Sequence, residues 1–275
     1  DEIPDSTIAS FLTAITYRGV SHDELRIIRE IMIAHSHLIT PNVNGSLIDN
    51  CGTGGDMANS FNISTAASIV ASASGLNVAK HGNRSASGIF GSADFFEYIG
   101  FNLDTSVNVL VNTLERIGLS FLFAPKFHPN LKRISGIRKQ LGFKTIFNMI
   151  GPLCNPCTNI TAQVIGLSDP KLFELVSNAM IKSNIKKIIL VHSMDGMDEL
   201  SNTARNNMLI LKSGNIERHE IDPNLLDLKL VKKEQIQVKS KEDSAKTTLQ
   251  TIYGKSTSAK QDIVFLNAAI ALIAG

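Results

Sequence analysis

The sequence has little net charge and no long hydrophobic run, and each shortage excludes a class of protein. Its 275 residues include 27 Lys or Arg against 25 Asp or Glu, a formal net charge of +2. This charge is too small to indicate a nucleic-acid-binding or membrane-binding surface. No apolar run is long enough to cross a bilayer, and the first residues lack the profile of a signal peptide. We therefore expect a soluble, cytoplasmic protein with no nucleic-acid or membrane partner.

Cysteine is also scarce, with Cys51, Cys154 and Cys157 as its three positions. The last two have the CxxC spacing of redox motifs and of half zinc sites. No second pair completes a zinc site, and the motif does not open a helix after a strand, as redox motifs do. The low count indicates a reducing intracellular environment and leaves any role of the CxxC pair open.

The order of the sequence patterns predicts a mixed α/β protein with a helical start. Residues 5–17 carry apolar side chains at helical spacing, and Ser21 with Glu24 forms a capping box before a second helix. Residues 41–45 break this pattern, and strand–loop–helix units follow. We predict a helical domain over residues 1–44, followed by a larger α/β domain with a mostly parallel central sheet.

Two glycine-containing loops, residues 51–56 (CGTGGD) and 80–85 (KHGNRS), each follow a short apolar run. Between them, residues 62–75 predict a helix that Ser64 or Thr65 can cap and a terminal glycine can end. The order of strand, loop, helix, strand and loop indicates a βαβ unit. Both loops are then expected at one edge of a parallel sheet.

The residue types in these loops suit a phosphorylated ligand that arrives with magnesium. Glycines let successive backbone N–H groups point at an anion, and the following helix adds unpaired N–H groups and a positive dipole end. Hydroxyls, cations and one carboxylate complete the set, which comprises Gly52, Thr53, Gly54, Gly55, Asp56, Ser64, Thr65, Lys80 and Arg84. For either loop alone, a tight turn or a solvated basic loop is the alternative, but both loops in one βαβ unit favour a ligand site.

A second candidate site is an acidic loop after the apolar strand expected over residues 186–192. It carries Asp195, Asp198 and Glu199, whose mutual repulsion a magnesium ion with ligand phosphate oxygens would relieve. The alternative is that these residues open a following helix, whose first turn favours negative charge. The loop alone does not decide between them.

Three further side chains have both a structural and a functional interpretation. His81 and His192 lie at strand ends, where a histidine makes a single structural hydrogen bond or transfers a proton. Arg138 lies in a basic helix, where it is solvated by default, although its planar fork is suited to a small carboxylate.

The remaining patterns predict alternating helices and strands. Helices are expected over residues 91–98, 104–117, 129–141, 171–182 and 263–274, strands over 119–124 and 162–167, and a hairpin from 208–212 and 216–219. Residues 151–156 predict a loop, and residues 223–260 carry no clear pattern. The chain starts without methionine and stops within an apolar helix, so we expect the native protein to extend beyond both ends.

Several motifs together resemble one family, the anthranilate phosphoribosyltransferases. In order, they are GTGGD at 52–56, NIST at 62–65, KHGNRS at 80–85, GSAD at 91–94, Arg138, Asn148 to Pro152, GMDE at 196–199 and residues 262–271 with LNAA at 266–269. Each motif alone is weak evidence, but together and in this order they are specific, and they cover essentially the whole chain.

This resemblance implies a fold, a reaction and a partner. The fold is a small helical domain, joined by a middle helical segment near residues 127–145, with an α/β phosphoribosyl-binding domain over residues 46–126 and 146–275. The reaction transfers the phosphoribosyl group of phosphoribosyl pyrophosphate to the amine of anthranilate, with Mg²⁺, in a homodimer. The alternatives are a pyrimidine nucleoside phosphorylase of the same fold and a non-enzymatic nucleic-acid-binding paralogue.

The resemblance also implies roles for individual residues. Those expected to bind phosphoribosyl pyrophosphate are Gly52, Thr53, Gly55, Asp56, Asn62, Ser64, Thr65, Lys80 and Ser92. Those expected to line the anthranilate site are His81, Asn83, Arg138 and Gly151, and the expected magnesium ligands are Ser64, Asp198 and Glu199. No general base is identified.

Two positions depart from the family pattern. Met57 stands where a glycine usually follows the aspartate, and Phe90 stands where a small residue usually precedes GSAD. Both are expected to narrow the loops that hold phosphate.

Overall fold

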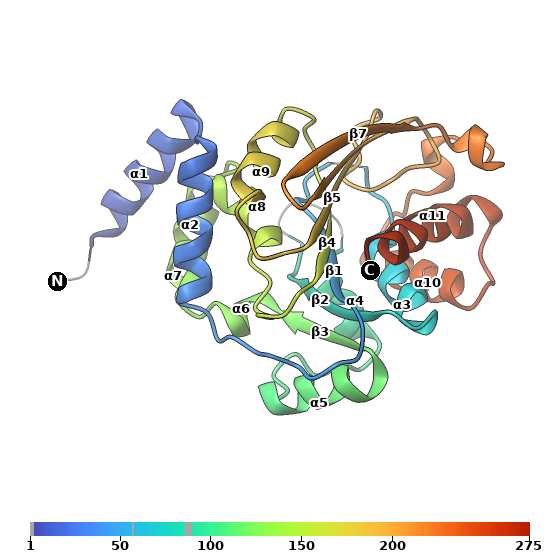
Figure 1. The fold of residues 1–275 in the computed structure, drawn as a ribbon, viewed down its shortest axis with the longest axis horizontal. Coiled ribbons are helices and arrows are strands. Elements are labelled where there is room, and N and C mark those ends of the chain that lie inside the picture. Colours follow the sequence, from blue (N-terminus) through green and yellow to red (C-terminus); the bar gives the residue numbers. More distant parts are fainter. Residues whose placement is uncertain (1–2, 57, 86–89) are drawn as a thin grey trace.

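The computed structural model describes residues 3–56, 58–85 and 90–275, whose strands form one sheet in the order β3-β2-β1-β4-β5-β6-β7. The strands are β1 (Leu47–Gly52), β2 (Asn77–Gly82), β3 (Leu119–Phe123), β4 (Ala162–Gly166), β5 (Lys187–Ser193), β6 (Asn206–Lys212) and β7 (Asn215–Ile221). The strands from β3 to β5 are parallel, and β6 and β7 add an antiparallel hairpin at one edge. The predicted α/β class with a mostly parallel sheet is confirmed (Figure 1).

Alternate residues of the central strands divide the core between the two faces of the sheet. In β4, Val164 joins one apolar cluster, whereas Ile165 joins the cluster on the opposite face. In β5, Ile189 and Ile188 divide in the same way. Because successive strand residues point to opposite faces, an apolar run is what a strand covered on both sides requires.

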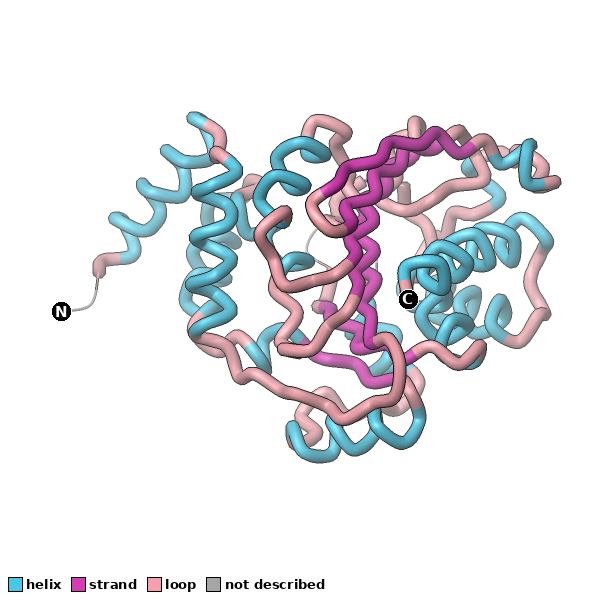
Figure 2. Tube along the Cα trace, in the orientation of Figure 1, coloured by secondary structure: helices cyan, strands magenta, loops and turns pink. Residues whose placement is uncertain are grey.

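Helices cover both faces of the sheet, as Figures 1 and 2 show. One face carries α3 (Ile63–Ala73), α4 (Ser92–Tyr98), α10 (Lys241–Ile252) and α11 (Ser258–Ala274). The other carries α1 (Asp5–Arg18), α2 (His22–Ala34), α5 (Val107–Ile117), α6 (Ala124–Phe127), α7 (Leu131–Leu141), α8 (Ile146–Ile150) and α9 (Leu172–Met180). Short 3₁₀ turns are η1 (Gly151–Leu153), η2 (Pro223–Leu226) and η3 (Lys233–Gln235).

The first two helices lie at the blue end of Figure 1, where α2 stands beside α9 and α1 projects farther from the sheet. α1 packs against α7, and α2 packs against α9. Their buried residues, such as Leu12 and Leu25, share one apolar cluster with Ile188 of the sheet. The helical and α/β parts therefore meet in a continuous core, and the domain boundaries given above stay predictions.

Several helix ends follow the sequence signals. The capping box of Ser21 and Glu24 at the start of α2 is confirmed, and Gly75 has the left-handed backbone, φ +96°, expected after α3. The predicted cap of α3 by Ser64 or Thr65 is wrong, because the helix already begins at Ile63, with Asn62 at its N-cap. No helix in the described ranges is long and apolar enough to cross a membrane.

Candidate active site at the carboxyl ends of the strands

The carboxyl ends of β1 and β2 open into a cavity of about 340 Å³, the edge at which parallel sheets bind ligands. All but one of the residues expected to bind substrates or metal line this cavity: Gly52, Thr53, Gly55, Asp56, Asn62, Ser64, Lys80, His81, Asn83, Ser92, Arg138, Gly151, Asp198 and Glu199. The exception is Thr65, whose side chain is fully buried in α3 with its hydroxyl unpartnered. Phe90 also lines the cavity, and Met57 lies outside the described residues.

The conformation of the glycine loop after β1 depends on left-handed glycines and on backbone hydrogen bonds to neighbouring segments. Gly54 and Gly55 have φ of +69° and +74°, a conformation that residues with a side chain rarely adopt. Thr53 fixes the loop to β4, because its N–H donates to the Gly166 carbonyl at 2.9 Å. The Gly54 N–H donates to the Asp198 carboxylate at 2.6 Å, so the loop is tied to the acidic loop as well.

An acidic cluster faces the glycine loop. Carboxylate oxygens of Asp56, Asp198 and Glu199 lie within 4.8 Å of one another. Burial, and then the nearby Asp56 charge, raise the pKa of Asp198 to about 7, and burial with the Asp198 charge raises the pKa of Glu199 well above its usual range. Like charges held this closely need a cation or a proton, and three carboxylates are a hard-cation donor set.

The third predicted member of the acidic loop is not in the cluster. The Asp195 carboxylate accepts a hydrogen bond from Thr203 and lies 3.8 Å from the Lys233 ammonium. The helix-opening interpretation of this loop is also wrong, because turns and bends, with no helix, lead from β5 to β6. The third carboxylate of the cluster is instead Asp56, which the sequence placed in the glycine loop among the residues expected to bind phosphoribosyl pyrophosphate.

Close packing fixes Asp198 against the strand ends. A Cβ atom on Gly52 would lie 2.2 Å from the Asp198 Oδ2, and one on Gly166 would lie 1.5 Å from the Asp198 carbonyl oxygen. Behind the cluster, Asn267 of α11 bonds both backbone groups of Leu200, accepting from its N–H at 3.0 Å and donating to its carbonyl at 2.7 Å. The acidic loop is thus clamped from two sides.

Lys80 provides a buried cation at the floor of the cavity. Its side chain is 2% exposed, and the ammonium donates to the Asn50 carbonyl and, at 3.2 Å, to the Ser64 hydroxyl. Burial lowers the pKa of Lys80, which the Asp49 carboxylate partly offsets. Lys80 is therefore a fixed positive group beside the start of α3, where an anion is favoured.

The two candidate histidines have different surroundings. His81 is buried on the cavity wall with its Nε2 unpartnered, and burial, with the nearby His128, lowers its pKa to about 3, so its ring is neutral. His192 is buried outside the cavity lining and bonds the Leu167 carbonyl through Nδ1 at 2.7 Å. The structural interpretation therefore fits His192.

Arg138 lines another part of the cavity wall, together with Phe147 and Asn148. Its Nη2 donates to the Asn148 Oδ1 at 3.0 Å, and the guanidinium carbon lies 5.7 Å from the centre of the Phe147 ring. Burial lowers the pKa of this arginine, and its Nε is buried without a partner. A half-buried guanidinium beside an aromatic ring suits a flat aromatic carboxylate.

The sequence did not single out several groups around this wall. Phe147 carried no signal, since an aromatic residue on a short helix is usually core. Arg29 of α2 donates from Nε to the Leu153 carbonyl at 2.8 Å and so supports the turn after Gly151. Lys144 donates to the Gly55 carbonyl at 2.8 Å, across the glycine loop.

Comparison with known proteins decides between the families that share such a site. Residues 44–275 match the family described as "Glycosyl transferase family, a/b domain". The chain is 40% identical over 268 residues to the anthranilate phosphoribosyltransferase of Acetivibrio thermocellus, a match covering 98% of this chain and 77% of that protein. It is 38% identical over 274 residues to the Alkaliphilus metalliredigens enzyme, covering 100% and 80%. The chain belongs to the anthranilate phosphoribosyltransferase family.

Solved structures agree with this membership in the anthranilate phosphoribosyltransferase family. The crystal structure of the Thermus thermophilus enzyme superimposes with a TM-score of 0.90 at 31% identity, covering 99% of this chain and 80% of that one. The Saccharomyces cerevisiae enzyme, solved in complex with PRPP and Mg, has a TM-score of 0.88 at 24% identity, covering 97% and 75%. The second likeness is one of fold.

Proposed function

We infer that this protein transfers the phosphoribosyl group of phosphoribosyl pyrophosphate to the amine of anthranilate, giving N-(5-phosphoribosyl)anthranilate and pyrophosphate in tryptophan biosynthesis. The observation that carries this inference is one cavity with two unlike walls. The acidic cluster and glycine loop form one wall, and Arg138 beside Phe147 forms the other. One wall suits a metal-bound diphosphate, and the other suits a flat carboxylate.

We propose Ser64, Asp198 and Glu199 as the residues that hold Mg²⁺. The fit rests on the crowded carboxylates and on Ser64, which lines the same cavity and whose hydroxyl accepts from the Lys80 ammonium at 3.2 Å. Bound there, the ion would offset the negative charge that develops on the leaving pyrophosphate. Asp56 lies within the same cluster and is positioned to share this role.

For the phosphoribosyl pyrophosphate side we propose Gly52, Thr53, Gly55, Asp56, Asn62, Ser64, Thr65, Lys80 and Ser92. The glycine loop and Lys80 present fixed donors and a fixed cation before the substrate arrives, which is how a site stabilises developing charge at low cost. Thr65 is buried away from the cavity, so its part in this set is to support α3 from within.

For the anthranilate side we propose His81, Asn83, Arg138 and Gly151, with Arg138 binding the carboxylate. Among the described residues proposed for this wall, none is suited to be a general base, because the pKa of His81 is lowered to about 3. The protein's own residues then act by orienting the amine toward the ribose carbon and by excluding water. A pyrimidine nucleoside phosphorylase or a nucleic-acid-binding paralogue would have no use for the Asp198 and Glu199 pair.

We also propose a homodimer formed through the two N-terminal helices. Their outer face exposes Phe11, Tyr17, Ile27 and Ile31, and it is hollowed beside Phe11. An exposed apolar patch of this kind is typical of a protein interface. The domain division and the cytoplasmic location stay predictions from the sequence.

The experiment that tests this function follows the fluorescence of anthranilate after addition of phosphoribosyl pyrophosphate. We expect the signal to fall only when Mg²⁺ is present, and to fall much more slowly in Asp198→Asn. A wild-type protein that leaves anthranilate unchanged under both conditions would refute the assignment. Loss of signal that continues with a chelator would refute the metal site alone.

A further inference from the structure

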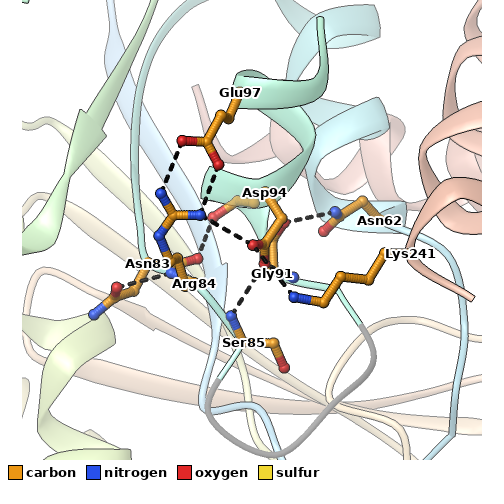
Figure 3. Close-up of polar contacts among 9 residues, drawn as sticks. Asn62, Asn83, Arg84, Ser85, Gly91, Asp94, Glu97 and Lys241 are labelled. Atoms are coloured by element: carbon orange, nitrogen blue, oxygen red, sulfur yellow. Dashed lines mark hydrogen bonds and ion pairs between the residues drawn. The ribbon is translucent and has the colours of Figure 1, made fainter. Parts of the chain in front are cut away.

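Beside the cavity, four charged side chains form a cluster of their own, shown in Figure 3. The Arg84 guanidinium makes two hydrogen bonds to Glu97, at 2.7 and 2.9 Å, and a third contact to Asp94 at 3.3 Å. Lys241 of α10 lies 3.9 Å from the same Asp94 carboxylate. Arg84 lines the cavity, whereas Glu97 and Lys241 lie outside its lining.

Asp94 connects this cluster to the backbone around the cavity. Its side chain is 9% exposed, and its Oδ2 accepts from the N–H groups of Gly91 at 2.8 Å and of Ser85 at 3.4 Å. The chain passes Gly91 so closely that a Cβ atom there would lie 2.3 Å from the Ser85 nitrogen. One carboxylate therefore ties two separate points of the chain together.

The same backbone carries residues proposed to bind substrate. The Ala93 N–H donates to the Asn83 carbonyl at 3.2 Å, and Asn62 donates to the Gly91 carbonyl at 3.0 Å. A shift of Asp94 would therefore move Asn83 and release Asn62. The placement of both side chains depends on a carboxylate that contacts neither of them.

The charge of Arg84 is already matched inside the cluster. Two cations and two carboxylates sum to zero, and the fork of the guanidinium points at Glu97 (Figure 3). A phosphate in the cavity would have to compete with both carboxylates for this arginine. A bidentate arginine–carboxylate pair fixes geometry as well as charge.

We propose that Arg84 is a positioning residue, which together with Glu97 holds Asp94 and so sets the backbone of Asn83 and Gly91, and that it does not bind phosphate. This inference rests on the proposed function for its substrates. It differs from the first interpretation of the basic loop, in which Arg84 offered its charge to the ligand. Lys80 alone then supplies the cation of that loop.

The test compares Arg84→Met, Glu97→Ala and the double variant with the wild type. KM for each substrate, kcat, and the affinity for Mg²⁺–pyrophosphate are measured, with the melting temperature as a check of folding. The matched control is Arg205→Met, whose guanidinium lies 3.1 Å from both Glu220 and Asp222 on the far hairpin. Amide exchange at Gly91 is followed in every variant.

If Arg84 acts through Glu97 and Asp94, each single variant raises KM for phosphoribosyl pyrophosphate by about tenfold. The double variant then has a KM no higher than that of the more impaired single variant, because both substitutions break the same interaction. The Gly91 amide exchanges faster in all three, and the control is unchanged. If Arg84 instead binds phosphate, Glu97→Ala leaves this KM and the pyrophosphate affinity unchanged or improved, and that result overturns the proposal. A fully additive double variant overturns it too.

Failure of the proposed function is distinguishable from failure of this inference. A wild-type protein that does not consume anthranilate refutes the function and leaves the pairing to be judged by exchange at the Gly91 amide. Faster exchange in both single variants then supports the positioning role. Unchanged exchange in Glu97→Ala refutes it.

Discussion

Individual residues in this site are shaped by burial of charge. Asp198 and Lys80 are both nearly withdrawn from water, and burial moves their pKa values in opposite directions, each toward the neutral form. Burial disfavours the charged form of each group, and for Lys80 the Asp49 carboxylate partly offsets this. The cavity therefore favours a ligand that brings both a cation and an anion, as a magnesium-bound diphosphate does.

The stability of the metal-free protein should depend on pH through Asp198. Its pKa is about 7 in the folded protein and about 3.9 unfolded, so between these values the folded state binds the extra proton. This contribution is present at low pH and is lost as pH rises toward about 7. His81 has the opposite effect: between about pH 3 and 6.5 it makes the free energy of unfolding rise with pH, because its pKa is lowered on folding.

A variant isolates the Asp198 contribution, since the His81 slope is common to both proteins. With a chelator present, Asp198→Asn should gain stability over the wild type by about 1 kcal/mol or more as pH rises from 5 to 8. Urea unfolding at several pH values measures this difference. A difference that stays constant with pH would contradict it, and added Mg²⁺ should stabilise the wild type alone.

At the scale of elements, the site depends on how closely two strand ends approach the acidic loop. Gly166 at the end of β4 has no room for a side chain, because the Asp198 carbonyl oxygen occupies that space. Gly136 in the middle of α7 has open space around it. Substituting each glycine by alanine therefore separates the cost of a steric clash, at Gly166, from the gain in helix propensity, at Gly136.

Gly166→Ala should destabilise the protein by about 3 kcal/mol and displace the acidic cluster, because backbone atoms must move. Gly136→Ala should stabilise it by about 0.5–1 kcal/mol, since alanine is the better helix former. Thermal unfolding and Mg²⁺ binding measure the two effects. If both substitutions changed stability and Mg²⁺ binding equally, packing against Asp198 would not be the reason for a glycine at position 166.

A second element-scale prediction concerns α2. Arg29→Met removes the hydrogen bond to the Leu153 carbonyl and should cost about 1 kcal/mol of stability. KM for anthranilate should rise severalfold while KM for phosphoribosyl pyrophosphate stays constant, since the supported turn begins at Gly151. Arg26→Met on the same helix, which loses only the surface pairs with Asp23 and Glu30, is the control. A parallel rise in both KM values would exclude this local role.

The sequence predicted those parts of the site that depend on local order. Glycine loops that follow apolar runs give the strand ends directly, so Gly54 and Lys80 could be placed at one edge. The sequence could not predict that Asp56, and not Asp195, completes the acidic cluster, because this depends on how the loop after β5 approaches the loop after β1. The helix α10 was missed because its buried side is made of small and hydroxyl side chains, such as Ala245 and Thr248, which give no apolar periodicity.

At the scale of the whole molecule, the two N-terminal helices form both a wall of the core and an exposed surface. Leu12 and Leu25 are buried against the α/β part, while Phe11 and Tyr17 are 60% and 88% exposed. The inner residues stabilise the fold. The outer residues remain largely exposed and bury little apolar surface within this chain.

Phe11→Asp should therefore turn a dimer into a monomer without unfolding the protein. A charge placed at the centre of an apolar interface has no partner and resists burial. Sedimentation at several protein concentrations measures the change. Tyr253→Asp, at a 72% exposed position on α10's side of the sheet, is the control and should leave the association unaltered. A wild type that sediments as a monomer throughout would remove the basis for this interface.

The clamp of Asn267 on Leu200 has a consequence for recombining this chain with a relative. The Asn267 amide pairs with both the N–H and the carbonyl of Leu200, one residue after Glu199, as the backbone of a neighbouring strand would. An amide does not titrate, so this link persists while the carboxylates beside it change their charge. A chimera that takes the acidic loop from one parent and α11 from another inherits a mismatched pair. The crossover point should therefore lie outside both segments.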